Sequence, residues 1–507
     1  MGDAMRRVPR FCVTAVLAAM LCLFAGLAIT GWFVTAHLGA TAEAGEVITF
    51  VREGLIPCVV LTMLMLLTLV GAHRLLERFA RFHLSAALCA LWLAGTLVFL
   101  LSANVQQMYD FAYVSEAAQL FAQGNYKPME IDYFNVYSYQ LGICLPMEIV
   151  LRLIPGLNLN LFMQALNAVL SVATAGVLAA LAQMIFEGSG VRCAALLLSV
   201  LFLPAMLYNI YVYGTLPMLF LSACAMLCFV RYLCARRTGA ALAYALLTAL
   251  AYVLKPNAAI PMIAMGIAAV LDVMTSRDWK LLGFAALSVV LAAALARGVI
   301  AQYELRSGVR LTGDVSMLAR LVMGLQEGGP AAGWFNRYTE QFFGFDVTAA
   351  QERATASADL AARLSQMRAD PRMAAAFFRD KLLSQWLEPT YSTMWYGNLC
   401  EKTGGLAQAV FAQDGLVRAL LEGYMKISQQ AFYILAVLGL IGTLLTKRSV
   451  AQLILPLTIL GGLLYHMIFE AKSQYIYVYA LFMIPLAARG LCMCGDMLQR
   501  GLDNGKG

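Results

Sequence analysis

One acidic residue stands where it could remove a proton from a reacting group. Asp110 follows a long apolar run and opens a second pattern, in which apolar residues recur at intervals of 3, 4 and 3 residues: Phe111, Val114, Ala118 and Phe121. This spacing predicts a short amphipathic helix from Asp110 to Gly124. The carboxylate then has two interpretations. It caps the helix by accepting backbone N–H bonds, or it serves as a general base where the apolar run meets water.

Three basic residues could hold an anion near such a base. Lys255 precedes Pro256 in a very short connection between two apolar runs, and Lys472 lies just before the last run. Arg297 lies near the end of another run. Cations of this kind bind phosphate groups through charge-assisted hydrogen bonds. The alternative is that each long side chain only extends from an apolar surface to water.

The composition identifies the elements that position these residues. Of 507 residues, 61% are hydrophobic and 13% are charged, whereas soluble domains have about 45–50% and about 25%. The chain is therefore expected to be an all-α polytopic membrane protein with about twelve transmembrane helices. The expected spans begin near Phe11, Leu55, His83, Asn160, Cys193, Thr215, Ala240, Ala258, Leu281, Gln430, Ala451 and Gln474.

A thirteenth apolar run, from Val136 to Ile154, is expected not to cross the membrane. It contains Pro146, and it carries Glu148 and Arg152 four residues apart on one helical face, which favours a juxtamembrane helix. With twelve spans, Lys and Arg concentrate in the segments that lie inside the cell. Both termini are then cytoplasmic, and loops 104–159 and 303–428 are extracytoplasmic. The net charge of +7 has this topological explanation, so no nucleic-acid partner is implied.

Four regions follow from this topology. They are an N-terminal two-span extension (1–82), a transmembrane core (83–302) that includes the first outer loop, a helical extracytoplasmic domain (303–428), and the C-terminal spans with a cytoplasmic tail (429–507). In the third region, Asp370 and Pro371 predict a helix start. Phe377 and Trp386 lie on the apolar side of this helix, and the expectation is an amphipathic helix on the membrane surface.

Several short motifs follow one another along the chain in the same order as in one group of enzymes. They are 124–126 (Gly-Asn-Tyr), 132–137 (Asp-Tyr-Phe-Asn-Val-Tyr), 211–214 (Tyr-Val-Tyr-Gly), 254–257 (Leu-Lys-Pro-Asn), 381–391 and 470–475. Together with the lone Asp110, this order resembles the GT-C membrane glycosyltransferases, and most closely the glycosyltransferase family 39-like subgroup related to protein O-mannosyltransferases and aminoarabinose transferases. The resemblance implies a GT-C-like fold with juxtamembrane helices.

The same resemblance implies a function and a set of site residues. Enzymes of this group transfer a sugar from a polyprenyl-phosphate donor to an acceptor on the outer face, with inversion and with an acidic residue of the first loop as general base. By position that residue is Asp110. Lys255, Lys472 and Arg297 are then expected to contact the donor phosphate. The expected lining of the substrate cavity is Glu116, Asp132, Tyr133, Tyr137 and Tyr475.

Two other functions stay open from the sequence. One is a transporter or flippase of a lipid-linked or anionic substrate, and the other is a catalytically inactive structural protein with a GT-C fold. The expected location is a bacterial plasma membrane, where the partners would be membrane lipid, the lipid-linked sugar and an unknown acceptor of the cell envelope. No metal and no cofactor are expected, because the histidines and cysteines show no ligand spacing.

Overall fold

The computed structural model describes residues 2–40, 45–79, 83–186, 188, 190–311, 315–343, 347–446 and 449–504. Within these residues, ten helices are long and apolar enough to cross a membrane. They lie in α1 (Gly2–Gly31), α2 (Leu55–Arg78), α3 (Leu84–Ala103), α7 (Leu159–Ile185), α10 (Thr215–Ala235), α12 (Ala259–Ser276, preceded by η5, Pro256–Ala258), α13 (Lys280–Ser307), α19 (Leu416–Leu444), α20 (Ile454–Ile468, preceded by η7, Val450–Leu453) and α21 (Ser473–Asn504).

The two remaining expected spans are also helical but irregular. One is divided into α8 (Gly190–Leu201), α9 (Leu203–Leu207) and η4 (Tyr208–Ile210), with a bend of 59°. Pro204 lies in the first turn of α9, where its missing N–H does not cost a helical hydrogen bond. The other is α11 (Thr238–Leu254), which has only 17 residues. Each of the twelve apolar runs thus forms a helix, and the multi-span all-helical fold class is confirmed.

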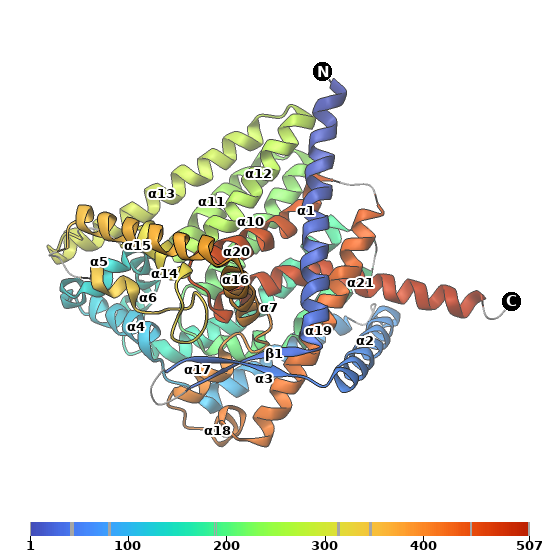
Figure 1. Cartoon of the computed structure of the whole chain (residues 1–507), viewed down its shortest axis with the longest axis horizontal. Helices are drawn as coiled ribbons and strands as arrows, with labels where there is room; N and C mark the ends of the chain where they lie inside the picture. The colour runs from blue at the N-terminus through green and yellow to red at the C-terminus, as the bar shows by residue number, and fades with distance from the viewer. Residues whose placement is uncertain are drawn as a thin grey trace.

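The core lies where α19 and α21 pack against each other. Glycines on both helices allow the close approach, since a Cβ at Gly439 would lie 1.9 Å from the carbonyl oxygen of Leu486. A Cβ at Gly490 would lie 1.9 Å from the carbonyl oxygen of Leu435. Helix α1 packs along α19, and Figure 1 shows the last part of α21 running out of the bundle toward the C-terminus.

The first long loop folds into short helices. They are α4 (Tyr109–Ala122), η2 (Lys127–Glu130), α5 (Asp132–Val136), η3 (Ser138–Gln140) and α6 (Leu141–Leu153). Helix α4 buries Val114, Ala118 and Phe121, as the sequence pattern predicts, and it packs against α6. The run from Val136 to Ile154 is interrupted, and α6 has only 13 residues, which confirms that this run does not form a spanning helix.

The charged pair in α6 belongs to an ionic cluster in which Glu148 is buried and Arg152 is exposed. Glu148, with 1% of its side chain exposed, accepts a hydrogen bond from Arg152 Nε at 2.9 Å. It also receives two hydrogen bonds from Arg306 of α13, at 2.6 and 3.1 Å, and one from the hydroxyl of Tyr303 at 2.6 Å. These bonds tie the first loop to the end of α13.

The second long loop forms a helical layer beside the spans. It contains α14 (Met317–Leu325), η6 (Tyr338–Phe342), α15 (Ala349–Ala369), α16 (Pro371–Trp386), α17 (Thr393–Leu399) and α18 (Gly405–Phe411). In Figure 1, α14, α15 and α16 lie together at one side of the bundle.

Helix α16 begins as predicted, but the protein covers its apolar face. The Asp370 side chain caps it by accepting bonds from the N–H groups of Arg372 and Met373. Phe377 and Trp386 are 3% and 1% exposed, because the protein itself covers this face. The expectation of an amphipathic helix at the membrane surface was therefore wrong, since the apolar face packs inside the protein.

A small antiparallel sheet, which was not predicted from the sequence, lies between the first two spans. Strand β1 (Val34–Gly39) pairs with β2 (Val47–Arg52), with Val34 opposite Arg52 and Gly39 opposite Val47. The sheet is held against the rest of the protein by backbone bonds. The N–H of Ala36 donates to the carbonyl of Leu387 at 3.0 Å, and the N–H of Ile48 donates to that of Pro330 at 3.1 Å.

Candidate functional site

Asp110 lies in the first turn of α4 without acting as its cap. The N-cap residue is Met108, whose backbone N–H donates to the hydroxyl of Tyr396 at 3.0 Å. The Asp110 carboxylate accepts no hydrogen bond from any residue that the structure describes. Tyr109 is held at a φ of +54°, a strained conformation for a bulky residue. The carboxylate is thus available to a ligand.

The electrostatic surroundings of Asp110 make it a stronger base than an ordinary carboxylate. Its side chain reaches solvent, yet desolvation by the surrounding protein raises its pKa above the usual 3.8. The ammonium groups of Lys472 and Lys255 oppose this shift, which means that both cations act on the carboxylate. Asp110, Lys255 and Lys472 are brought together from α4, the end of α11 and the connection between α20 and α21.

Lys255 is the more deeply held of the two cations. Its Nζ donates to Thr215 Oγ1 at 2.7 Å and lies 4.6 Å from the centroid of the Tyr213 ring. Burial lowers its pKa from 10.5 to about 7, although Asp110 and Glu470 partly offset the effect. No carboxylate of the described residues forms an ion pair with Lys255, so this cation can accept an anionic partner.

Lys472, by contrast, already has an anionic partner. Its Nζ lies 2.5 Å from Oε1 of Glu46, the residue before β2, and 5.2 Å from the centroid of the Trp395 ring. Lys472 is expected from the sequence to contact a donor phosphate, and any such anion would share this lysine with Glu46.

Three predicted tyrosines line the same region. The rings of Tyr133 and Tyr137 have centroids 5.2 Å apart. Burial raises the pKa of both, and Asp110 is the next cause, which places both hydroxyls near that carboxylate. The buried hydroxyl of Tyr133 has no hydrogen-bond partner among the described residues. Tyr475 donates to Oε1 of Glu470 at 3.1 Å.

The other three predicted residues lie apart from these contacts. Glu116 is exposed on α4, six residues after Asp110 and hence on another face of the helix. Asp132 starts α5, and Arg297 is exposed within α13. None of the three side chains forms a hydrogen bond or an ion pair with a residue in the described ranges.

Three charged residues of this region were not predicted from the sequence: Glu46, Glu470 and Arg320. Burial raises the pKa of Glu470, against the effect of Lys472. Arg320 of α14 donates to the carbonyl of Val136 at 3.3 Å. Its guanidinium lies 5.6 Å from the centroid of the Tyr137 ring. Glu470 lies inside the motif at 470–475, whereas no pattern in the sequence indicated Glu46 or Arg320.

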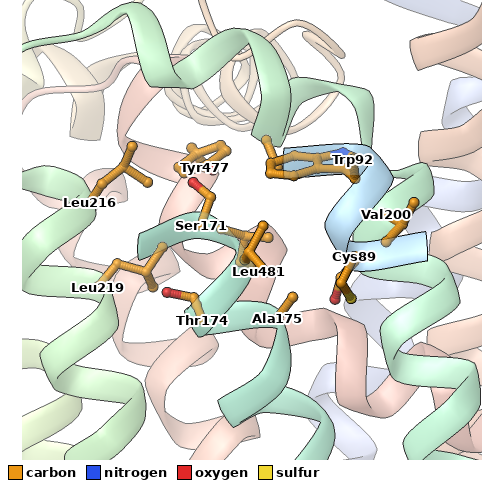
Figure 2. Close-up of a pocket in the computed structure, with 13 residues that line it drawn as sticks. Cys89, Trp92, Ser171, Thr174, Ala175, Val200, Leu216, Leu219, Tyr477 and Leu481 are labelled. Atoms are coloured by element: carbon orange, nitrogen blue, oxygen red, sulfur yellow. The ribbon is translucent and has the colours of Figure 1, made fainter. Parts of the chain in front are cut away.

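A separate, mostly apolar cavity with a volume of about 20 Å³ lies among the spans. Figure 2 shows Trp92 and Cys89 of α3 facing Ser171 and Thr174 of α7, with Tyr477 nearby. None of the candidate site residues lines it. Within the described part of the chain, no three His, Cys, Asp or Glu side chains are grouped so that they could hold a metal ion.

Comparisons with known proteins identify a family and a distant similarity to solved structures. No curated protein matches the chain. A solved structure of ArnT from Cupriavidus metallidurans bound to undecaprenyl phosphate is similar over 82% of this chain and 78% of that one, with 14% identity and a TM-score of 0.34. Similarity this low supports no conclusion about reaction or ligand. Residues 9–308 match the family described as conserved hypothetical integral membrane protein, and because they are more than half of the 507 residues, the chain belongs to that family.

Proposed function

We propose that the protein is an inverting glycosyltransferase that moves a sugar from a polyprenyl-phosphate donor to an extracytoplasmic acceptor, with Asp110 as general base. The observation that carries the proposal is the environment of Asp110. This carboxylate accepts no hydrogen bond from the described residues, its pKa is raised by desolvation, and two lysine ammonium groups act on it. A base beside two cations suits the displacement of a phosphate by a hydroxyl group.

The reaction would be a single displacement. Asp110 takes the proton of the acceptor hydroxyl while that oxygen attacks the anomeric carbon from the face opposite the phosphate. The bond from the anomeric carbon to the phosphate oxygen breaks, and the phosphate leaves with the electron pair. The phosphate needs little acid assistance, so the base supplies the main proton transfer, which contributes about 10²–10⁴ in rate. The configuration at the anomeric carbon is inverted.

The proposed donor contacts follow from the geometry of the cations. Lys255 has no carboxylate ion-pair partner in the described ranges, and its ammonium would bind the phosphate oxygens and stabilise the developing charge. Lys472 would contribute from beside Glu46. The unpartnered hydroxyl of Tyr133 supports a further hydrogen bond to the donor or to the sugar.

The side of the membrane is also part of the proposal. Arg320, in the second long loop, bonds to Val136, in the first long loop, so the two loops lie on one side of the spans. We assign this side to the exterior, with both termini in the cytoplasm. We also propose that the chain divides into a two-span extension, a core, an outer domain and C-terminal spans.

The test of the reaction is a transfer assay. Purified protein in lipid nanodiscs is incubated with radiolabelled polyprenyl-phosphate sugars and bacterial cell-envelope extract. We expect the label to enter a product through a new glycosidic bond. Movement of the labelled lipid across a vesicle membrane without any such bond would instead indicate a transporter. The absence of both activities would favour the inactive structural protein.

Binding of the lipid phosphate is tested separately. Lys255→Ala should weaken binding of undecaprenyl phosphate at least tenfold, since the variant removes a charge-assisted contact of roughly 1.5–3 kcal/mol. Lys127→Ala is the matched control, because Lys127 is an exposed lysine of the first long loop, which also contains Asp110. Arg297→Ala reports whether donor contacts extend to α13. Unchanged binding in Lys255→Ala would show that this lysine does not hold the phosphate.

A further inference from the structure

The ion pair between Lys472 and Glu46 joins positions 426 residues apart in the sequence. The two side chains are 17% and 16% exposed, so the pair is largely removed from bulk water. A pair in such surroundings is screened much less by salt than a surface pair. The carboxylate therefore changes the charge that an anion meets at Lys472.

The protein holds Glu46 in place from both sides. The indole N–H of Trp395 donates to the carbonyl of Gly45 at 3.4 Å, and the N–H of Ile48 donates to the carbonyl of Pro330 at 3.1 Å. At the far end of β2, Glu53 forms an ion pair with Lys426 at 2.8 Å. These bonds anchor the backbone on both sides of Glu46 and keep its carboxylate within reach of Lys472.

Several charged groups surround this ion pair. Asp110 interacts with Lys255 and Lys472, and Glu470 interacts with Lys472 and Lys381. Among these groups, Glu46 is the carboxylate in direct contact with Lys472. Each negative charge that a ligand brings to Lys472 is therefore repelled by Glu46 at short range, and a ligand with two negative charges is repelled more strongly than a ligand with one.

We propose that Glu46 is a specificity-determining residue that makes this site prefer a singly charged phosphodiester over a doubly charged phosphomonoester. The inference rests on the proposed function, in which the donor is a sugar phosphodiester and the lipid product is a phosphomonoester. When the bond to the anomeric carbon breaks, the phosphate keeps the electron pair and gains one charge, while the acceptor proton goes to Asp110. Because the second pKa of a phosphomonoester is about 6, the product is mostly doubly charged at pH 7.5. Glu46 then favours its release.

Binding of two matched probes tests this role. The probes are farnesyl phosphate, a monoester, and farnesyl methyl phosphate, a diester, titrated at pH 7.5 into protein in nanodiscs of zwitterionic lipid. The wild type should bind the diester more tightly. In Glu46→Gln, the affinity for the monoester should rise on the order of tenfold and the affinity for the diester should rise less, so the preference shrinks or reverses.

Two further variants separate charge from structure. Glu46→Asp keeps the negative charge and should keep the preference for the diester. Glu53→Gln removes the other carboxylate that pairs with a lysine at this sheet, and it should leave the ratio of the two affinities unchanged. The proposal is overturned if Glu46→Gln and the wild type have the same affinity ratio, or if Glu46→Asp loses the preference as completely as Glu46→Gln.

The outcome is independent of the transfer assay. If the protein makes no glycosidic bond but Glu46→Gln changes the affinity ratio, the proposed function is refuted and the charge selection by Glu46 is supported. Active transfer with an unchanged affinity ratio in Glu46→Gln would refute the charge selection alone.

Discussion

Lys255 should set the alkaline limit of the reaction. Burial lowers its pKa from 10.5 to about 7, and the ammonium binds phosphate only while it is protonated. The charged fraction then falls from about a half at pH 7 to about a tenth at pH 8 and about a hundredth at pH 9. Because kcat/KM for the donor reports the free enzyme, it should fall about fivefold between pH 7 and pH 8 and about tenfold between pH 8 and pH 9.

Replacing Lys255 with arginine should remove this fall in kcat/KM at alkaline pH. Arginine stays charged above pH 12, so Lys255→Arg should show a nearly constant kcat/KM for the donor between pH 7 and pH 9, even if its absolute value is lower. The assay is the initial rate of label transfer from the polyprenyl-phosphate sugar at low donor concentration, in one buffer series of constant ionic strength. At saturating donor, the bound phosphate holds the proton on Lys255, and the alkaline fall in kcat should move to higher pH.

The acid limb should belong to Asp110, because only the deprotonated carboxylate accepts a proton. Its pKa is raised by desolvation, so activity should rise with pH through a value above 3.8. Lys127→Arg is the control for the alkaline limb and should reproduce the wild-type profile. A wild-type kcat/KM that stays constant to pH 9, or an equal alkaline fall in Lys255→Arg, would refute the role of the Lys255 charge.

Two further predictions concern stability. Glu148→Gln should lower the free energy of unfolding by about 3–5 kcal/mol, because it leaves the Arg306 charge without its buried partner. The control Glu340→Gln, in an exposed ion pair, should change this free energy by less than about 1 kcal/mol. Equal effects of the two variants in thermal denaturation in detergent would contradict a stabilising role of the Glu148 cluster. Gly142→Ala should lower the melting temperature, since the added Cβ would lie 1.8 Å from a backbone carbonyl oxygen of α11. In the control Gly266→Ala, the added Cβ would meet no atom within 4 Å, and the melting temperature should not fall. An unchanged melting temperature in Gly142→Ala would contradict the close packing of α6 on α11.

The spans and the short helices could be predicted because their signals are local. An apolar run of about 20 residues predicts a span without knowledge of its neighbours, and the spacing of Val114, Ala118 and Phe121 gave the buried face of α4. Helix α16 shows where this approach fails. Its start at Asp370 is a local signal, whereas its environment depends on which part of the protein covers Trp386.

The contacts that define the site could not be predicted, because they join distant positions. The pair of Glu46 with Lys472 depends on a short sheet between the first two spans, and strands of 6 residues leave little pattern in an apolar chain. The bonds from Arg306 to Glu148 span 158 positions. The motifs indicated that Asp110, Lys255 and Lys472 share a region, but they gave no sign that one of these lysines is already paired.

The base function of Asp110 is tested most directly by measuring transfer and lipid-phosphate binding in the same preparation of Asp110→Asn. This variant keeps the shape of the side chain and removes its charge and its basicity. The rate of sugar transfer should fall by about 10²–10⁴, while undecaprenyl phosphate should bind at least as tightly as it does to the wild type, because a negative charge near Lys255 and Lys472 is lost. Glu116→Gln, a carboxylate change on the same helix, should reduce transfer far less. Near-normal turnover in Asp110→Asn, or loss of transfer in Glu116→Gln alone, would contradict the assignment of Asp110 as the base.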